Sequence, residues 1–140
     1  LMTNFNYPYF SRDVAEFWRR WHISLSTWFR DYLYIPLGGS RKSMKRTLTN
    51  VLIIFVVSGF WHGANWTFIV WGGLHALYIM PVVAFGLNRK HLDGKRSLAP
   101  KISEIAQIGL TFFLVCVAWI FFRAPSVGVA TDYLFGMVQR

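Results

Sequence analysis

The sequence predicts an all-α fold in which several helices cross a membrane. Of the 140 residues, 54% are hydrophobic and 19% are aromatic. Three segments contain no Asp, Glu, Lys or Arg: 48–61, 66–87 and 105–122. The last two exceed the length of about 18 apolar residues that a spanning helix needs, and the first is shorter. A soluble domain of this length rarely contains three such runs, so we interpret residues 1–140 as a section of one multi-pass membrane domain.

The positive charges support this fold and orient it. The formal net charge is +9, and basic residues cluster before the first apolar run and after the second. If both runs cross the bilayer, both clusters lie on one side, and the positive-inside rule places that side in the cytoplasm. The segment 88–104 is therefore predicted to be a cytoplasmic loop. Neither cluster is interleaved with aromatic residues that would stack on bases, which argues against nucleic-acid binding. The two clusters are Arg41, Lys42, Lys45 and Arg46, and Arg89, Lys90, Lys95, Arg96 and Lys101.

An amphipathic helix over residues 11–33 is the first element that the sequence predicts. Apolar side chains gather on one side of its helical wheel and charged side chains on the other. We expect Ser11 to cap the helix and Asp13 to lie in its first turn, where the helix dipole favours a negative charge. Glu16 and Arg20 have the i, i+4 spacing of an ion pair. Because the helix carries too many charges to span, it should lie at the membrane interface or against the spanning helices.

The three membrane helices follow in order. Residues 36–39 contain Pro and two Gly, which end the amphipathic helix. In the second apolar run, Gly72-Gly73 and Pro81 predict close packing or a kink. A short amphipathic tail follows the third apolar run.

The lone Cys116 lies inside the third run, so no disulfide framework exists. Because the chain begins with Leu rather than Met, we expect it to be a section of a longer chain.

Four histidines differ in their predicted roles. His91 lies in the polar loop and is interpreted as solvated surface. His75 lies within the second membrane run, where a neutral imidazole bonded to a neighbouring helix is expected. His22 falls on the apolar side of the amphipathic helix. We weigh an interfacial ring whose nitrogen reaches water against a functional role, and slightly favour the latter.

His62 is the strongest functional candidate. If the first apolar run begins at the cytoplasmic boundary, its 14 residues reach about 21 Å into a hydrocarbon core about 30 Å thick. An ionisable side chain at that depth indicates a function, although a structural hydrogen bond between helices remains an alternative. Trp61, Asn65 and Trp66 offer polar groups nearby and are candidates to line a substrate channel.

A neutral imidazole at that position suits general base chemistry, because it takes a proton from a hydroxyl group and returns it. No His, Cys or carboxylate stands three or four residues from His62, so no metal site is predicted. The sequence also has no Gly-rich phosphate loop and no Ser nucleophile elbow. The residues alone therefore indicate a membrane protein with a buried, functional histidine.

Three stretches of the sequence extend this interpretation. "NFNYPYFSRDVAEFWRRWHISLSTWFRDYLYIPLGGSR", "SGFWHGANWTFIVWGGLHAL" and "WIFFRAPS" closely resemble the membrane-bound O-acyltransferase (MBOAT) family. Within that family they are most similar to the bacterial branch of alginate O-acetyltransferase membrane subunits. The likeness covers residues 4–126 and matches one section of a longer, many-helix chain, so a partial MBOAT fold is expected.

The resemblance implies a function. Members of the family transfer an acyl group to a hydroxyl, using a histidine at the position of His62, and a second functional histidine matches His22. It implies acetylation of an exported polysaccharide such as alginate, at the bacterial inner membrane, with extracytoplasmic acetyl-transfer partner proteins. No bound cofactor is expected; acetyl-CoA or an acetyl carrier would supply the acyl group.

Other functions remain open. The same fold could pass D-alanyl to teichoic acid or acetyl to peptidoglycan. A protein of another class, a non-enzymatic transporter or scaffold, would use the histidine to relay protons or to brace helices. That alternative predicts binding or flux without ester formation.

Overall fold

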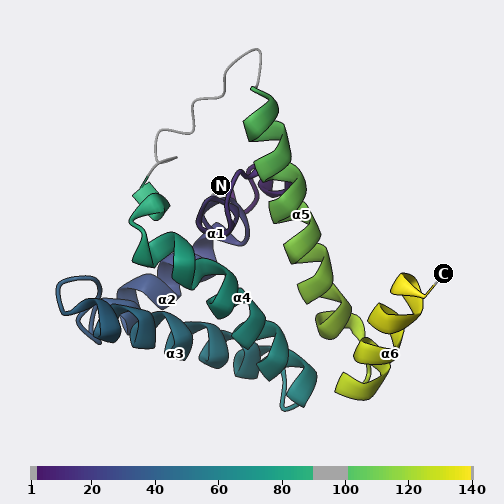
Figure 1. Cartoon of the computed structure of the whole chain (residues 1–140). Coiled ribbons are helices and arrows are strands. Elements are labelled where there is room, and N and C mark those ends of the chain that lie inside the picture. The colour runs from purple at the N-terminus through teal and green to yellow at the C-terminus, as the bar shows by residue number, and fades with distance from the viewer. Residues whose placement is uncertain (1–2, 90–100, 140) are drawn as a thin grey trace.

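The computed structural model describes residues 3–89 and 101–139, and within these ranges the chain is helical and has no strand. This confirms the predicted all-α class. The long helices are α3 (Met44–His62), α4 (Trp66–Ala84), α5 (Ile102–Arg123) and α6 (Val127–Val138), as Figure 1 shows. The short elements are η1 (Pro8–Phe10), α1 (Val14–Arg20), α2 (Ile23–Phe29), the π-helical turn η2 (Arg30–Tyr34) and η3 (Leu87–Arg89).

The long helices cover the three predicted membrane segments. Helices α4 and α5 are long and apolar enough to cross a membrane. Helix α3 contains the run 48–61, begins four residues earlier at Met44, and packs antiparallel against α4. Helix α4 ends at Ala84, before the predicted 87. Of the predicted loop 88–104, residues 90–100, which include His91, lie outside the described residues.

Two glycines bring α3 and α4 into direct backbone contact. A Cβ atom added to Gly59 would lie 2.2 Å from the carbonyl oxygen of Phe68, and one added to Gly72 would lie 2.2 Å from that of Phe55. The contact is therefore reciprocal across the hairpin. The close packing predicted at Gly72-Gly73 is confirmed at the first glycine only, because Gly73 faces open space.

The predicted continuous helix over 11–33 is wrong. Helix α1 ends at Arg20 and α2 begins at Ile23, and between them His22 adopts a left-handed backbone conformation with φ 46°. The lead-in to the chain explains the break. The backbone N–H of Asn6 donates to the carbonyl of Arg20 (2.9 Å), and that of Ile23 donates to the carbonyl of Asn4 (3.0 Å). These bonds give the backbone partners that a continuous helix would supply internally.

The start of α1 also differs from the prediction. Asp13, not Ser11, is the N-cap, and its carboxylate accepts a hydrogen bond from the Glu16 backbone N–H at 2.7 Å. Ser11 is fully buried, and its hydroxyl donates to the carbonyl of Pro8 at 2.6 Å. Since that hydroxyl closes the preceding turn, the next available acceptor takes the capping position.

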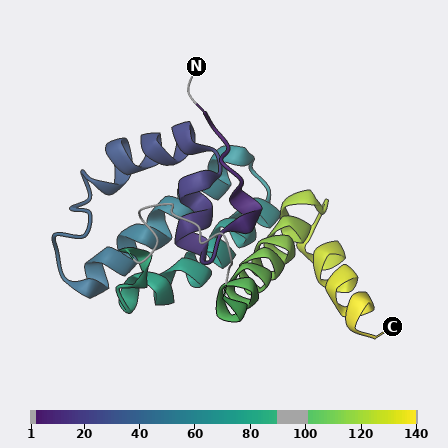
Figure 2. The same ribbon diagram turned by 90° about the horizontal axis from the view of Figure 1, so that it is seen from above.

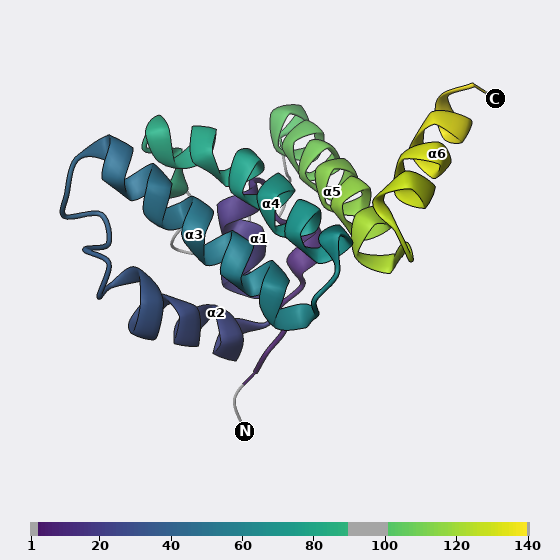
Figure 3. The same ribbon diagram turned by 90° about the horizontal axis from the view of Figure 1, so that it is seen from below.

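Charged side chains of α1 face the protein interior. Glu16 is 1% exposed and forms ion pairs with Arg12 and Arg20, which confirms the predicted Glu16–Arg20 pair. Arg12 also reaches Glu104 on α5 at 3.5 Å. Helix α1 thus lies against α4 and α5, the second of its two predicted locations, and Figures 2 and 3 show it tucked beside them while α6 projects away.

Glu16→Gln is expected to destabilise the full-length protein. Burial alone would raise the pKa of Glu16, but the hydrogen bonds and charges of Arg12 and Arg20 outweigh it, and the net pKa is lowered. Because the pKa of Glu16 is lower in the folded protein, the ionised carboxylate contributes its full stabilisation at pH values above the ordinary pKa of 4.5. This contribution is lost as the pH falls through the lowered pKa. Removing the carboxylate leaves the Arg20 guanidinium without its ion-pair partner and leaves Arg12 with Glu104 alone, at a cost of about 3–5 kcal/mol. Thermal unfolding in detergent at neutral pH measures the loss.

The matched control is Asp31→Asn, which removes an exposed carboxylate paired with Arg30 and should leave the melting temperature unchanged. Acid titration adds a second readout, because the Glu16→Gln variant should lose less stability than the wild type between pH 5 and the acid limit of folding. Equal melting temperatures for wild type and Glu16→Gln would contradict the buried ion-pair account.

Candidate functional site

His22 and His62, far apart in the sequence, line the same cavity of about 440 Å³. The break between α1 and α2 supplies one histidine and the end of α3 supplies the other. The structure therefore brings the two predicted functional histidines together. The cavity is otherwise mainly aromatic, and its lining residues are Tyr9, Trp18, Trp21, His22, Leu25, His62, Trp71, Trp119, Phe122 and Arg123.

The His62 imidazole is held in place by aromatic rings from α4 and α5. His62 is the last residue of α3, and Gly63, with φ 156°, ends that helix. Its ring lies edge-on to Trp71 of α4 (centroids 5.2 Å apart, 88°) and to Phe122 of α5 (5.1 Å, 82°). In the part of the chain that the structure describes, no hydrogen bond engages its nitrogens. The ring is thus fixed by packing, with its nitrogens available to a substrate.

His22 sits in a strained backbone conformation. A non-glycine residue in the left-handed region costs about 1–2 kcal/mol, and such strain is common at functional sites. The Asn4 side chain stabilises the break by accepting the backbone N–H of Ser24 at 3.0 Å. The Nδ1 atom of His22 is buried and has no hydrogen-bond partner among the described residues. That nitrogen therefore has an unused hydrogen-bonding capacity in the wall of the cavity.

Two indole groups of the cavity wall were not predicted as site residues. Trp71 is 1% exposed, and its Nε1, like that of Trp119, is buried without a hydrogen-bond partner within residues 3–89 and 101–139. Unsatisfied buried donors are rare, and in a functional site they fit a ligand that supplies the acceptor. By contrast, Trp18 Nε1 donates to His75 Nδ1 at 3.3 Å. The sequence does not distinguish these indoles from one another, because they differ only in their tertiary partners.

The remaining predicted residues lie elsewhere. His75 is 0% exposed and bonded to Trp18, which confirms the expected bond between helices. Asn65 caps α4 by accepting the Thr67 N–H (3.1 Å), and its side chain donates to the carbonyl of Pro125 (3.2 Å). Trp61 and Trp66 are 59% and 76% exposed. None of the three predicted channel residues Trp61, Asn65 and Trp66 lines the histidine cavity, so their channel role stays a prediction.

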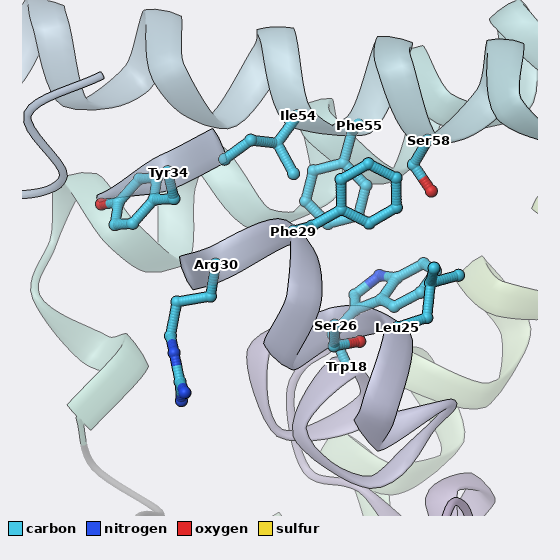
Figure 4. Close-up of a pocket in the computed structure, with 9 residues that line it drawn as sticks. All are labelled: Trp18, Leu25, Ser26, Phe29, Arg30, Tyr34, Ile54, Phe55 and Ser58. Atoms are coloured by element: carbon cyan, nitrogen blue, oxygen red, sulfur yellow. The ribbon is translucent and has the colours of Figure 1, made fainter. Parts of the chain in front are cut away.

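A second cavity of about 150 Å³ adjoins the first (Figure 4). It lies between α3 and the segment formed by α2 and η2, and it shares Trp18 and Leu25 with the histidine cavity. Its other end is lined by Arg30 and Tyr34, which precede the basic loop. Trp18 and Leu25 therefore lie between this cavity and the histidine cavity.

In the described part of the chain, no group of three His, Cys, Asp or Glu side chains is placed to bind a metal ion.

The fold and the cavity define a section of a helical membrane protein that carries two histidines on one aromatic-lined cavity. A sequence model of the MBOAT, membrane-bound O-acyltransferase family matches residues 2–99. The chain belongs to this family.

Curated relatives extend the comparison. The chain is 46% identical over 129 residues to the probable alginate O-acetylase of Pseudomonas aeruginosa, covering 92% of this chain and 23% of that protein. It is 41% identical to the peptidoglycan O-acetyltransferase of Helicobacter pylori, over 99% of this chain and 25% of the relative. The teichoic acid D-alanyltransferase of Streptococcus thermophilus is 33% identical, over 85% and 32%. The chain thus spans about a quarter to a third of the length of these relatives.

Proposed function

We propose that the chain is the histidine-bearing section of a membrane O-acyltransferase that acetylates an exported polysaccharide such as alginate. The observation that carries this proposal is the shared cavity of His22 and His62. Family membership and the identity to an alginate O-acetylase support the chemistry and the acceptor class.

His62 would act as the general base. Its neutral imidazole takes the proton of an acceptor hydroxyl, and the hydroxyl oxygen forms a bond to the acyl carbonyl carbon. The bond between that carbon and the leaving atom of the donor then breaks, and the histidine returns the proton to the leaving atom. His22, on the same cavity wall, would assist proton transfer or position the substrate. Acetyl-CoA or an acetyl carrier is the proposed donor.

The two substrates would reach the histidines from opposite sides. The donor would enter through the cavity between α2 and α3, because that cavity ends near the basic loop that the charge rule places in the cytoplasm. The acceptor would enter from the side of Arg123, where α5 ends. The protein would be a multi-pass protein of the bacterial inner membrane, surrounded by the lipid bilayer, and would work with extracytoplasmic acetyl-transfer partner proteins.

A second candidate uses the same site on another acceptor. The Helicobacter pylori relative is a peptidoglycan O-acetyltransferase and the Streptococcus thermophilus relative a teichoic acid D-alanyltransferase. The chain is more identical to the alginate O-acetylase than to either of these two relatives, which favours an exported polysaccharide such as alginate as the acceptor. A transporter or scaffold would leave the polymer without new esters.

Mass spectrometry of the exported polymers tests the proposal. We expect acetyl esters on the polysaccharide of cells that carry the gene, and their loss when the gene is deleted. Restoring the full-length gene should restore the esters. Esters found only on peptidoglycan, or D-alanyl esters on teichoic acid, would move the protein to the second candidate. Unchanged acylation of all three polymers after deletion would refute the acyltransferase assignment.

A further inference from the structure

His75 is a buried ionisable side chain that the proposed reaction does not use. It lies in the middle of α4, is 0% exposed, and lines neither the histidine cavity nor the cavity between α2 and α3. Its ring is enclosed by the aromatic side chains of three helices, which are Phe17, Trp18, Phe55, Trp71 and Tyr78. Its Nδ1 accepts the hydrogen bond from Trp18 Nε1 at 3.3 Å.

This hydrogen bond determines which nitrogen of His75 carries the proton. A ring nitrogen that accepts a hydrogen bond is unprotonated, so the neutral ring carries its proton on Nε2. That Nε2 is buried and has no hydrogen-bond partner within residues 3–89 and 101–139. An unpaired buried N–H destabilises a fold, so a histidine is less suited to this position than an apolar side chain if packing is its only role. The nitrogen that has a partner is Nδ1, and that partner is Trp18.

Trp18 stands between two cavities. It lines both the cavity of about 150 Å³ between α2 and α3 and the histidine cavity of about 440 Å³. Figure 4 shows Trp18 and Leu25 at one end of the smaller cavity and Tyr34 at the other. In the proposed function the donor enters the smaller cavity, so its acyl group must pass Trp18 to reach His62. The position of the indole therefore sets the width of this passage.

The bond to His75 fixes the orientation of the indole. The Trp18 ring lies edge-on to Phe55 of α3 (centroids 5.2 Å apart, 66°) and to Trp71 of α4 (5.8 Å, 71°). Such ring contacts hold the indole by its surface, whereas a hydrogen bond is directional and also fixes where its N–H points. His75 is thus the polar anchor of the wall between the two cavities.

We propose that His75 is a positioning residue that holds the Trp18 indole across the passage, so that a short acyl group reaches His62 and a longer one does not. The inference rests on the proposed function and deepens it, because it assigns the selection of the acyl group to a particular pair of side chains. Trp18 contacts the acyl group and determines specificity, and His75 acts only through Trp18. A longer acyl group requires the indole to turn, which breaks the bond to His75 and leaves Nδ1 unpaired in the protein interior.

The test measures which acyl group the full-length protein transfers in cells. Cells that express each variant are supplied with propionate, which they convert to an activated propionyl group, one methylene longer than acetyl. Mass spectrometry gives the ratio of propionyl to acetyl esters on whichever exported polymer carries the esters. Because all variants are expressed in the same cells, differences in donor supply cancel when their ratios are compared.

Three variants change the anchor and one is the matched control. His75→Leu removes the acceptor, and Trp18→Phe removes the donor. His75→Asn restores an acceptor, because its Oδ1 lies the same number of bonds from Cβ as Nδ1 does. Trp119→Phe makes the same indole-to-phenyl change in another wall of the histidine cavity. Trp119 and Arg123 separate that cavity from a third one, of about 390 Å³, between α5 and α6.

We expect the wild type to form mainly acetyl esters, since one methylene in a closely fitted site gives about a 10- to 200-fold preference. His75→Leu and Trp18→Phe should raise the propionyl-to-acetyl ratio about 10-fold, and the double variant should raise it no further. His75→Asn should return the ratio towards the wild-type value, and Trp119→Phe should leave it unchanged. The melting temperature of His75→Leu in detergent should stay close to that of the wild type, because leucine removes the unpaired Nε2–H together with the bond to Trp18.

A histidine with only a structural role would lower the melting temperature and the amount of both esters, and would leave their ratio unchanged. That result overturns the inference while the acyltransferase assignment stands, and so does an equal rise of the ratio in Trp119→Phe. If His75→Leu does not fold, an unchanged ratio in Trp18→Phe, which leaves His75 in place, overturns it as well. If the wild type adds esters to no polymer, the proposed function fails and the inference falls with it.

Discussion

Replacing His62 with alanine in the full-length protein is expected to reduce acetyl transfer about 10²- to 10⁴-fold, the usual contribution of a general base. The imidazole is the ionisable group that the ends of α3, α4 and α5 enclose with aromatic rings, and alanine removes both its nitrogens from the cavity. Transfer is measured as acetyl esters formed on the polymer, at matched amounts of protein in the membrane.

Two controls separate chemistry from packing. Phe60→Leu changes an exposed residue of the same helical turn, which lies outside the cavity, and should retain activity. Added imidazole should restore part of the activity of His62→Ala, because the enlarged cavity admits the small base. Full acetylation by His62→Ala would exclude His62 from the reaction, and a loss that imidazole does not rescue in a well-folded variant would indicate a structural role.

Gly72→Ala is expected to disrupt the packing of α3 against α4. The new Cβ would lie 2.2 Å from the carbonyl oxygen of Phe55, a backbone atom that cannot rotate away. Helices α3 and α4 must then separate, at a cost of about 1–3 kcal/mol or more. Because α3 positions His62 and α4 positions Trp71, the same separation would open the histidine cavity. The melting temperature in detergent and the yield of folded protein measure the effect.

Gly73→Ala is the matched control for this prediction. It makes the same chemical change one residue later, where no atom of the described residues outside the neighbouring helical backbone lies within 4 Å of the added carbon. We expect its melting temperature to equal or slightly exceed that of the wild type, since alanine favours a helix. Gly59→Ala should resemble Gly72→Ala, because the contact is reciprocal. Equal stability of the Gly72→Ala and Gly73→Ala variants would contradict a glycine-mediated hairpin.

The local features of the sequence predicted most of the helices. The apolar runs correspond to α3, α4 and α5, because a run without charges indicates a helix wherever the surroundings are apolar. The helical wheel failed for residues 11–33. Periodicity reports which side chains share a face, and it does not report the bonds from Asn4 and Asn6 that divide this segment. The burial of Glu16 was also missed. Its partners Arg12 and Arg20 are only four residues away, but the side chain is buried because α1 packs against α4 and α5.

The candidate site was predicted only in part. The sequence analysis selected His62 and His22 because each has an ionisable ring in apolar surroundings and because the resemblance matches both positions. The structure places both on one cavity. The sequence analysis missed Trp71, Trp119 and Arg123, because neither an indole nor an arginine at the end of a helix has a distinctive sequence pattern. Asn65 was predicted for a channel because it is polar and close to His62 in sequence, but its side chain caps α4.

The sequence by itself determined that the chain is helical, suited to a membrane, oriented by its basic loops, and equipped with a histidine at the end of an apolar run. Those properties depend on hydrophobicity, charge and spacing along the chain. Only the tertiary structure decided that His22 and His62 line one cavity, that the indoles of Trp71 and Trp119 lack hydrogen-bond partners among the described residues, and that Arg123 lines two cavities. The reason is that a cavity is formed by side chains from separate helices, whose relative positions are set by close contacts such as those of Gly59 and Gly72.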